Sequence, residues 1–378
     1  MMMGGMETST ARRTLSASAR LLGRLRLDGL LLGGLIAIAV FGLLVLYSAS
    51  AQNLAFARGQ FLRLGLGLFV LVMLAQVHPK YLRMFAPWIY VGGVLLLLIV
   101  ALVGDVGKGA QRWLDLGFIR FQPSELMKLA VPMMCAWYLH DRPLPPNLFS
   151  QLALAGLILI PVALIAEQPD LGTALLIGAS GVFVILLAGL RLRVIFTLVP
   201  LLVGLAWVGW HFLHDYQRRR VLTFLNPEND PLGAGYHIIQ SQIAIGSGGV
   251  FGKGYMNGSQ GQLEFLPERT TDFIFAVIGE EFGLLGLLVL LGAYLFVIGR
   301  GLYLALECQD TFARLVAGSV SLTFFVYVFI NAGMVSGLVP VVGVPLPLVS
   351  YGGTSMVTLM AGFGILMSLH SHRKLVGS

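Results

Sequence analysis

The chain has 378 residues, of which 57% are hydrophobic and only 11% are Asp, Glu, Lys or Arg. So little charge cannot cover the surface of a soluble domain of this size, and composition therefore excludes a soluble globular fold. The net charge of +7 comes from basic residues spread over loops and ends, which argues against a nucleic-acid-binding stripe. The two cysteines, Cys135 and Cys308, do not make a disulfide framework.

Apolar runs long enough to cross a bilayer recur along almost the whole chain. They predict an all-α polytopic membrane protein with about ten transmembrane helices. We expect a single transmembrane domain over residues 29–372, between an N-terminal arm at 1–28 and a tail at 373–378. The expected spans are 29–49, 61–78, 84–104, 123–139, 151–167, 172–190, 194–213, 272–299, 315–336 and 347–369. The first is too long for a cleaved signal sequence, so we expect it to be retained.

Basic residues are concentrated in the segments on one side of this predicted bundle. They are Arg12, Arg13, Arg20, Arg24, Arg26, Lys80, Arg83, Arg142, Arg191, Arg193, Arg300, Arg314, Arg373 and Lys374. The positive-inside rule therefore predicts that both termini are cytoplasmic.

A long extracytoplasmic loop is expected between the seventh and eighth spans, at residues 214–271. Loops of this length are usually functional or disordered, and turn formers in this one predict a structured segment. Within it Tyr236, Ile239 and Ile243 recur at helical spacing, which predicts a short amphipathic helix. Such a helix could lie in the membrane interface or pack onto the bundle.

Three consecutive arginines stand at the start of this loop, namely Arg218, Arg219 and Arg220. Long loops tolerate such charge without a change of topology. The other interpretation is an anion site at the outer head-group level, because an Arg fork matches phosphate oxygens. Position alone leaves both open.

Ionisable residues in apolar spans are costly, so each is a candidate for a functional site. Glu125 and Lys128 lie three residues apart at the start of the fourth span, where they can form a structural ion pair or contact substrate, Lys128 by reaching a ligand phosphate. Asp170, in the turn before the sixth span, can cap that helix or contact a ligand. Glu280 and Glu281 lie deeper in the eighth span, and at least one must face the interior or water.

Asp272 begins the eighth span and is the strongest single candidate. A carboxylate at a helix N-terminus can act as the N-cap. Thr270 or Thr271 could cap instead, which would leave Asp272 for chemistry.

The segment Asn331–Ser355 combines three prolines with repeated glycines at membrane depth, which predicts irregular backbone. Such backbone is tolerated only where protein buries it or where it lines a cavity. Gly352 and Gly353 stand among hydroxyl residues that include Ser350 and Thr354, and suit close approach of a helix or a ligand.

Here the chain resembles the SEDS family of polytopic cell-wall proteins. The resemblance covers nearly the whole chain, and five motifs carry it: Lys108-Gly-Ala-Gln-Arg-Trp113, Gln122-Pro-Ser-Glu-Leu-Met-Lys128, Gln168-Pro-Asp-Leu-Gly-Thr173, Leu266-Pro-Glu-Arg-Thr-Thr-Asp-Phe273 and Asn331–Ser355. The stretches 230–240 and 262–269 are similar to the elongation branch of the family rather than to its division branch.

The resemblance implies a ten-span peptidoglycan glycosyltransferase that polymerises lipid II at the outer face of the cytoplasmic membrane during cell elongation. It implies that Asp272 matches the family's essential acidic residue. It also implies partnership with a class B penicillin-binding protein and with other membrane proteins of the elongation complex.

A β-1,4 product from an α-linked donor requires inversion, and we expect Asp272 to act as general base on the acceptor 4-hydroxyl. The diphosphate leaving group needs positive charge, for which Lys128, Arg112 and the three arginines are the candidates. Trp113 joins them as a candidate contact to substrate. No cofactor is certain; Asp272 with substrate phosphates could hold Mg²⁺ or Mn²⁺. Two other functions stay open: a lipid II flippase and a non-catalytic scaffold for the penicillin-binding protein.

Overall fold

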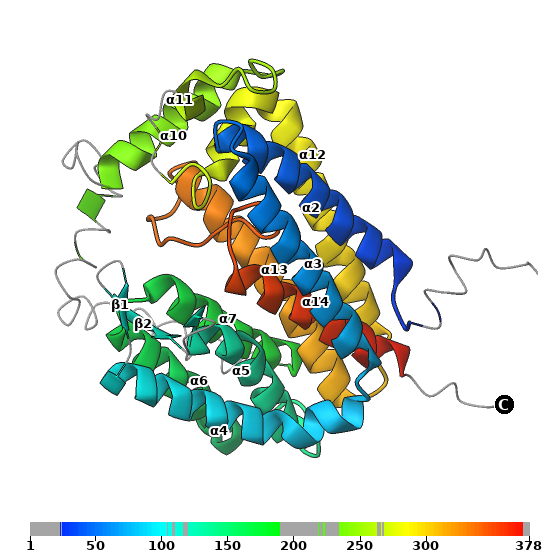
Figure 1. The fold of residues 1–378 in the computed structure, drawn as a ribbon. Coiled ribbons are helices and arrows are strands. Elements are labelled where there is room, and N and C mark those ends of the chain that lie inside the picture. The colour runs from blue at the N-terminus through cyan, green and yellow to red at the C-terminus, as the bar shows by residue number, and fades with distance from the viewer. Residues whose placement is uncertain are drawn as a thin grey trace, which may run out of the picture.

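The computed structural model describes residues 23, 25–103, 105–107, 110–115, 120–189, 218, 222–223, 234–262, 266 and 268–372 (Figure 1). Seven of the described helices are long and apolar enough to cross a membrane. They are α2 (Gly29–Ala49), α3 (Leu54–Gln76), α4 (Pro79–Val103), α6 (Leu148–Glu167), α12 (Ile274–Leu306), α13 (Thr311–Val335) and α14 (Thr354–Ser371). The prediction of a multi-pass helical membrane protein is therefore confirmed.

Two further helices of 17 residues each complete the described bundle, α5 (Pro123–Leu139) and α7 (Leu171–Leu187). The expected span at 194–213 lies outside the described residues. Several predicted boundaries moved, and two of these shifts have a local cause. The helix expected from residue 61 already begins at Leu54, because the Asn53 side chain accepts from Ala55 N at 2.9 Å. The helix expected from residue 347 begins at Thr354, after a stretch whose prolines cannot join a helix interior.

α13 is the central helix of the bundle. Within an 18-residue apolar stretch of α13, 72% of the residues are buried inside the protein. The corresponding share in α3 is 28%, which leaves most of α3 to face lipid. α13 packs against α12 and α14 on one side and against α5 and α7 on the other. Figure 1 shows these as two groups, with α4–α7 lying apart from α2, α3 and α12. The irregular segment between α13 and α14 lies where the two groups meet.

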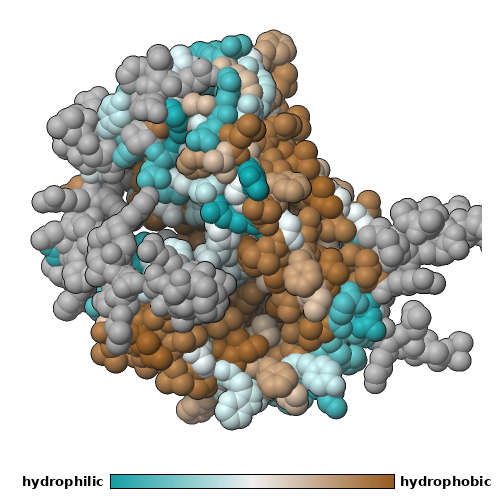
Figure 2. Space-filling model, viewed as in Figure 1, coloured by the Kyte–Doolittle hydropathy of each residue, from teal (hydrophilic) through white to brown (hydrophobic). Residues whose placement is uncertain are grey.

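Apolar and polar surfaces separate along the bundle. Figure 2 shows hydrophobic residues over the flanks formed by α2, α3 and α4, and hydrophilic residues gathered near α10 (Ala234–Gly248) and α11 (Ser259–Gln262). Exposed side chains such as Phe61, Phe69 and Leu95 belong to the flanks. A hydrocarbon environment around the flanks accounts for their exposure.

Three short strands lie between α4 and α5, and the sequence patterns did not predict them. β1 (Asp105–Gly107), β2 (Ala110–Asp115) and β3 (Arg120–Phe121) pair antiparallel in that order. They fix the position of Arg112 and Trp113 within β2.

The predicted amphipathic helix in the outer loop exists as α10. Its buried face carries Ile238, Ser241, Ala244 and Gly248, whereas Ile243 is 45% exposed. α10 therefore packs onto the bundle, as one of the two interpretations predicted, but through this face and not through Ile243. Small residues bring the α10 backbone against α12, and Ser241 Oγ donates to Val335 O of α13 at 2.8 Å.

α12 contains a break at Gly283, where φ is 64° and ψ is −163°. The peptide groups freed by the break pair with the loop that follows α10. Lys253 N donates to Glu280 O at 2.9 Å, and Gly254 N donates to Glu281 O at 3.0 Å. In return Leu284 N and Leu285 N donate to Gly249 O and Val250 O. The loop thus replaces the missing helical hydrogen bonds, which a membrane helix requires.

Gly283→Ala should lower the stability of the fold. The substitution places a Cβ in a positive-φ conformation and 2.6 Å from Val250 O. The backbone strain alone costs about 1–3 kcal/mol. Gly292→Ala, in the same helix with nothing within 4 Å of the added Cβ, is the matched control. Thermal unfolding in detergent should show a lower Tm for Gly283→Ala only, and equal Tm values for the two variants would contradict this description of the break.

Candidate functional site

Asp272 lies two residues before α12. Phe273 occupies the N-cap position, so both predicted N-cap positions, Asp272 and the threonines, are wrong. The Asp272 residue is half-buried. Its backbone is held by Asn331 of α13, whose side-chain amide donates to Asp272 O at 2.9 Å and to Val344 O at 2.8 Å. One buried amide therefore joins the start of α12 to the irregular segment 336–353.

The Asp272 carboxylate lies beside Gly343 in that segment. Gly343 has φ of 73°, and a Cβ added there would stand 3.5 Å from Asp272 Oδ2. Gly172, at the start of α7, is close to the same stretch, because its added Cβ would stand 2.7 Å from Val342 O. The glycine-rich and proline-rich pattern thus allows irregular backbone to pass between α7 and the candidate base.

Ser350 fastens the loop that carries Asp272. Its hydroxyl donates to Thr271 O and accepts from Leu346 N at 2.8 Å. Tyr351 N donates to Thr270 O at 2.8 Å. Gln60 of α3 donates to Ser350 O at 2.9 Å. Ser350 is 3% exposed, so its described contacts position the site rather than present a hydroxyl to substrate.

Glu125 and Lys128 form the buried ion pair that their spacing predicted. Lys128 Nζ lies 2.7 Å from Glu125 Oε1, and the two side chains are each 7% exposed. Lys128 Nζ also lies 5.3 Å from the centre of the Tyr327 ring. Among the described residues, Glu125 Oε2 has no hydrogen-bond partner. Tyr327 in turn packs against Val344, so the ion pair and Asp272 border the same irregular segment.

Arg112 and Asp170 form an ion pair, and both contact the turn between α6 and α7. Asp170 caps α7, since its Oδ1 accepts from Thr173 N at 3.2 Å, and its Oδ2 accepts from Gln122 at 3.2 Å. Arg112 Nη1 lies 3.8 Å from Asp170 Oδ2, while Nε donates to Gln168 O at 3.2 Å and Nη2 donates to Pro169 O. Capping is thus confirmed for Asp170, and the described donors of Arg112 already serve the turn.

The remaining predicted residues are spread around the site. Trp113 is half-buried in β2, and half-buried Thr354 is the first residue of α14. Arg218 is a half-buried helical residue, while Arg219 and Arg220 lie outside the described residues. Substrate binding by these residues stays a prediction.

Arg63 of α3 is a cation that the sequence analysis missed as a site residue. Its guanidinium carbon lies 4.3 Å from the centre of the Tyr351 ring, and an added Cβ at Gly353 would stand 3.6 Å from its Nε. Among the described residues, its buried Nη1 atom has no hydrogen-bond partner. The available signal was that Arg63 is a charged residue within an apolar run. It was missed because the positive-inside rule counted Arg63 only as a loop charge.

Glu280 and Glu281 are both buried, at 0% and 2% exposure, and they belong to the α12 break. Glu280 Oε1 lies 2.7 Å from Lys253 Nζ and accepts from Ser259 Oγ and Gln260 N. Glu281 accepts from Ser48 Oγ of α2. Burial and the nearby Glu281 charge raise the pKa of Tyr255 in the neighbouring loop. These carboxylates hold the outer loop, α2 and α12 together.

No group of three His, Cys, Asp or Glu side chains converges as a metal site within the described ranges.

Breaking the buried pair on α5 separates a structural from a chemical role. Lys128→Met leaves Glu125 unpaired in the interior and should destabilise the protein by about 3–5 kcal/mol. The double variant Glu125→Gln/Lys128→Met removes both charges and should recover much of that loss, as measured by thermal unfolding. If the double variant unfolds as readily as the single one, the pair is not the source of the stability.

Comparisons with known proteins agree on one family. The family model described as "Cell cycle protein", which covers FtsW, RodA and SpoVE, matches residues 29–375. The chain is 52% identical to the peptidoglycan glycosyltransferase MrdB of Escherichia coli K12, over 93% of this chain and 96% of that protein.

Two solved structures share the fold. A structure of a peptidoglycan synthase complex, described by its coordination of polymerization and crosslinking, aligns with a TM-score of 0.81 at 33% identity, over 92% of this chain and 98% of that one. The crystal structure of the Thermus thermophilus rod shape-determining protein RodA aligns with a TM-score of 0.70 at 32% identity, over 92% and 97%. This chain belongs to the FtsW/RodA/SpoVE family of cell cycle proteins.

Proposed function

We propose that this chain polymerises lipid II into peptidoglycan glycan strands, with Asp272 as the general base. Its assignment as a peptidoglycan glycosyltransferase is supported by the 52% identity to MrdB over nearly the full length of both proteins. The observation that carries the proposed site is the position of Asp272: a half-buried residue before α12 whose carboxylate lies beside the irregular backbone at Gly343. Irregular backbone at membrane depth lines cavities or is buried in protein.

The reaction is one in-line displacement. The acceptor 4-hydroxyl attacks the anomeric carbon of the donor sugar, and its proton passes to the Asp272 carboxylate. The bond from that carbon to the diphosphate oxygen breaks, and undecaprenyl diphosphate leaves with the electron pair. Inversion at the anomeric carbon gives the β-1,4 linkage. A hydroxyl is a weak nucleophile, so proton removal by a positioned base lowers the barrier.

Positive charge stabilises the leaving diphosphate. Arg63 and Lys128 are the described cations that suit this role best, because they approach the segment 344–353 from opposite groups of helices. Arg112 is a weaker candidate than the sequence suggested, because its guanidinium already binds the turn at 168–170. A divalent cation here would take most of its ligands from substrate phosphates and water.

The orientation of the protein in the membrane and its protein partners belong to the same proposal. The end of the bundle that carries Asp272 faces outward, and both termini are cytoplasmic, as the positive-inside rule predicts. The partner is a class B penicillin-binding protein, which is supported by the likeness to a structure described by polymerization and crosslinking together. Other membrane proteins of the elongation complex complete the assembly.

Asp272→Ala should abolish polymer formation, by at least about 100-fold, because general-base catalysis contributes roughly 10²–10⁴-fold. Polymerisation of lipid II by the purified protein, with and without its partner, is the measurement. Glu167→Gln is the matched control, since Glu167 is an exposed carboxylate at the same end of the bundle.

Normal polymer from correctly folded Asp272→Ala would overturn the assignment of the base. Transbilayer movement of lipid II without any polymer from the unmodified protein would favour the flippase instead. If polymerisation in the presence of the partner requires this protein but none of its site residues, the scaffold function is favoured.

A further inference from the structure

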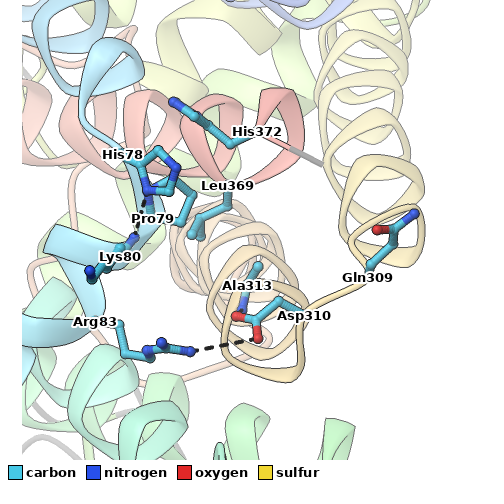
Figure 3. Close-up of a pocket in the computed structure, with 9 residues that line it drawn as sticks. All are labelled: His78, Pro79, Lys80, Arg83, Gln309, Asp310, Ala313, Leu369 and His372. Carbon is cyan, nitrogen blue, oxygen red and sulfur yellow. Dashed lines mark hydrogen bonds and ion pairs between the residues drawn. The ribbon is translucent and has the colours of Figure 1, made fainter. Parts of the chain in front are cut away.

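A polar cavity of about 420 Å³ lies at the end of the bundle opposite Asp272 (Figure 3). α12 begins beside Asp272 and ends beside this cavity, so the two are separated by the length of that helix. The polar side chains that line it come from the start of α4, the turn between α12 and α13, and the end of α14. They are His78, Lys80, Arg83, Gln309, Asp310 and His372. The catalytic proposal uses none of them.

Positive charge dominates this cavity. Asp310 is the one acid among the residues that line it. Oδ2 accepts from Ala313 N at 3.3 Å as the cap of α13, and Oδ1 lies 3.9 Å from Arg83 Nη1, which also contacts His140 Nε2. In the part of the chain that the structure describes, Lys80 Nζ has no ion-pair partner. Lys80 and Arg83 therefore outweigh Asp310.

Two histidines add hydrogen-bonding capacity. His78 Nδ1 accepts from Lys80 N at 3.1 Å, which assigns its proton to Nε2, a donor. The His78 and His372 rings meet at 4.6 Å between centroids. Burial lowers the pKa of His372, and the neighbouring Arg26 charge lowers it further. His372 Nδ1 donates to Ser368 O at 2.9 Å, so Nε2 accepts from Arg26, which does not itself line the cavity.

Exposed aromatic side chains follow Lys80 along α4. Tyr81, Phe85 and Trp88 recur at helical spacing and are 53%, 50% and 73% exposed. None of them lines the cavity, but the exposed side chain of Lys80 directly precedes Tyr81 in the chain. A cationic cavity at the start of a helix that exposes apolar and aromatic side chains suits an amphipathic lipid.

We propose that this cavity binds the phosphodiester headgroup of an anionic phospholipid. Lys80 and Arg83 pair with the phosphate oxygens, His78 and Gln309 donate to the headgroup, and the acyl chains lie along Tyr81, Phe85 and Trp88. Charge-assisted hydrogen bonds from Arg and Lys are the strong contacts to phosphate. Inorganic phosphate could make the same contacts with Lys80 and Arg83, but it has no acyl chains to lie along α4. Substitutions on α4 therefore distinguish a phospholipid from inorganic phosphate as the ligand.

The test uses the full-length chain purified in a neutral detergent. Binding of short-chain phosphatidylglycerol, short-chain phosphatidylcholine and inorganic phosphate is measured by native mass spectrometry and by the shift in Tm. Lys80→Gln/Arg83→Gln should weaken phosphatidylglycerol binding at least fivefold. The matched control is Arg142→Gln/Arg314→Gln, which removes the same charge from exposed residues at this end that do not line the cavity. It should bind as the unmodified protein does.

Two single variants test the headgroup contact and the acyl-chain contact separately. Lys80→Gln alone leaves the Arg83 contacts intact and should weaken binding at least twofold, whether or not the double variant folds. Phe85→Ser should weaken lipid binding and leave phosphate binding unchanged. Equal loss in the two double variants, or equal binding of both lipids, would overturn the site. Phosphate that binds as tightly as phosphatidylglycerol would overturn the lipid as its ligand.

Discussion

Peptide groups that leave a helix inside a bilayer must find partners within the protein, and this requirement organises the end of the bundle that carries Asp272. The side chain of Asn331 satisfies carbonyls of both Asp272 and Val344. Ser350 does the same for the neighbouring loop. The break at Gly283 obtains its partners from the loop after α10. The candidate base is therefore held by the same hydrogen bonds that make irregular backbone tolerable at this depth.

The buried charges follow the same logic. Glu280 and Glu281 tie α12 to the outer loop and to α2, while Glu125 and Lys128 neutralise each other within α5. A buried pair adds little net stability, but the loss of one partner is costly. Such groups thus give the end of the bundle that carries Asp272 one arrangement rather than several, and the proposed reaction, which must hold two lipid-linked sugars in line, benefits from that rigidity.

Hydropathy and capping patterns predicted most of the bundle. α2 and α5 begin and end at the predicted residues because apolar length and a terminal Pro or Asp signal are local features. The buried face of α10 was not predictable in this way, since Ser241, Ala244 and Gly248 pack by being small, which apolar periodicity does not register. The short strands, the break at Gly283 and the contact of Arg63 with Tyr351 depend on neighbours distant in sequence. At the candidate site, the sequence pointed to Asp272 and predicted the ion pair of α5, but it could not show that Arg112 and Ser350 are occupied by structural contacts.

The break in α12 has a kinetic consequence. The amide hydrogens of Leu284 and Leu285 are bonded to Gly249 and Val250 of an outer loop rather than to the preceding turn of their own helix. Amide hydrogens exchange with solvent only when their acceptor moves away. Exchange at two positions within a long membrane helix therefore depends on the opening of a loop outside that helix, and isotope uptake there reports on the loop segment that holds the break in place.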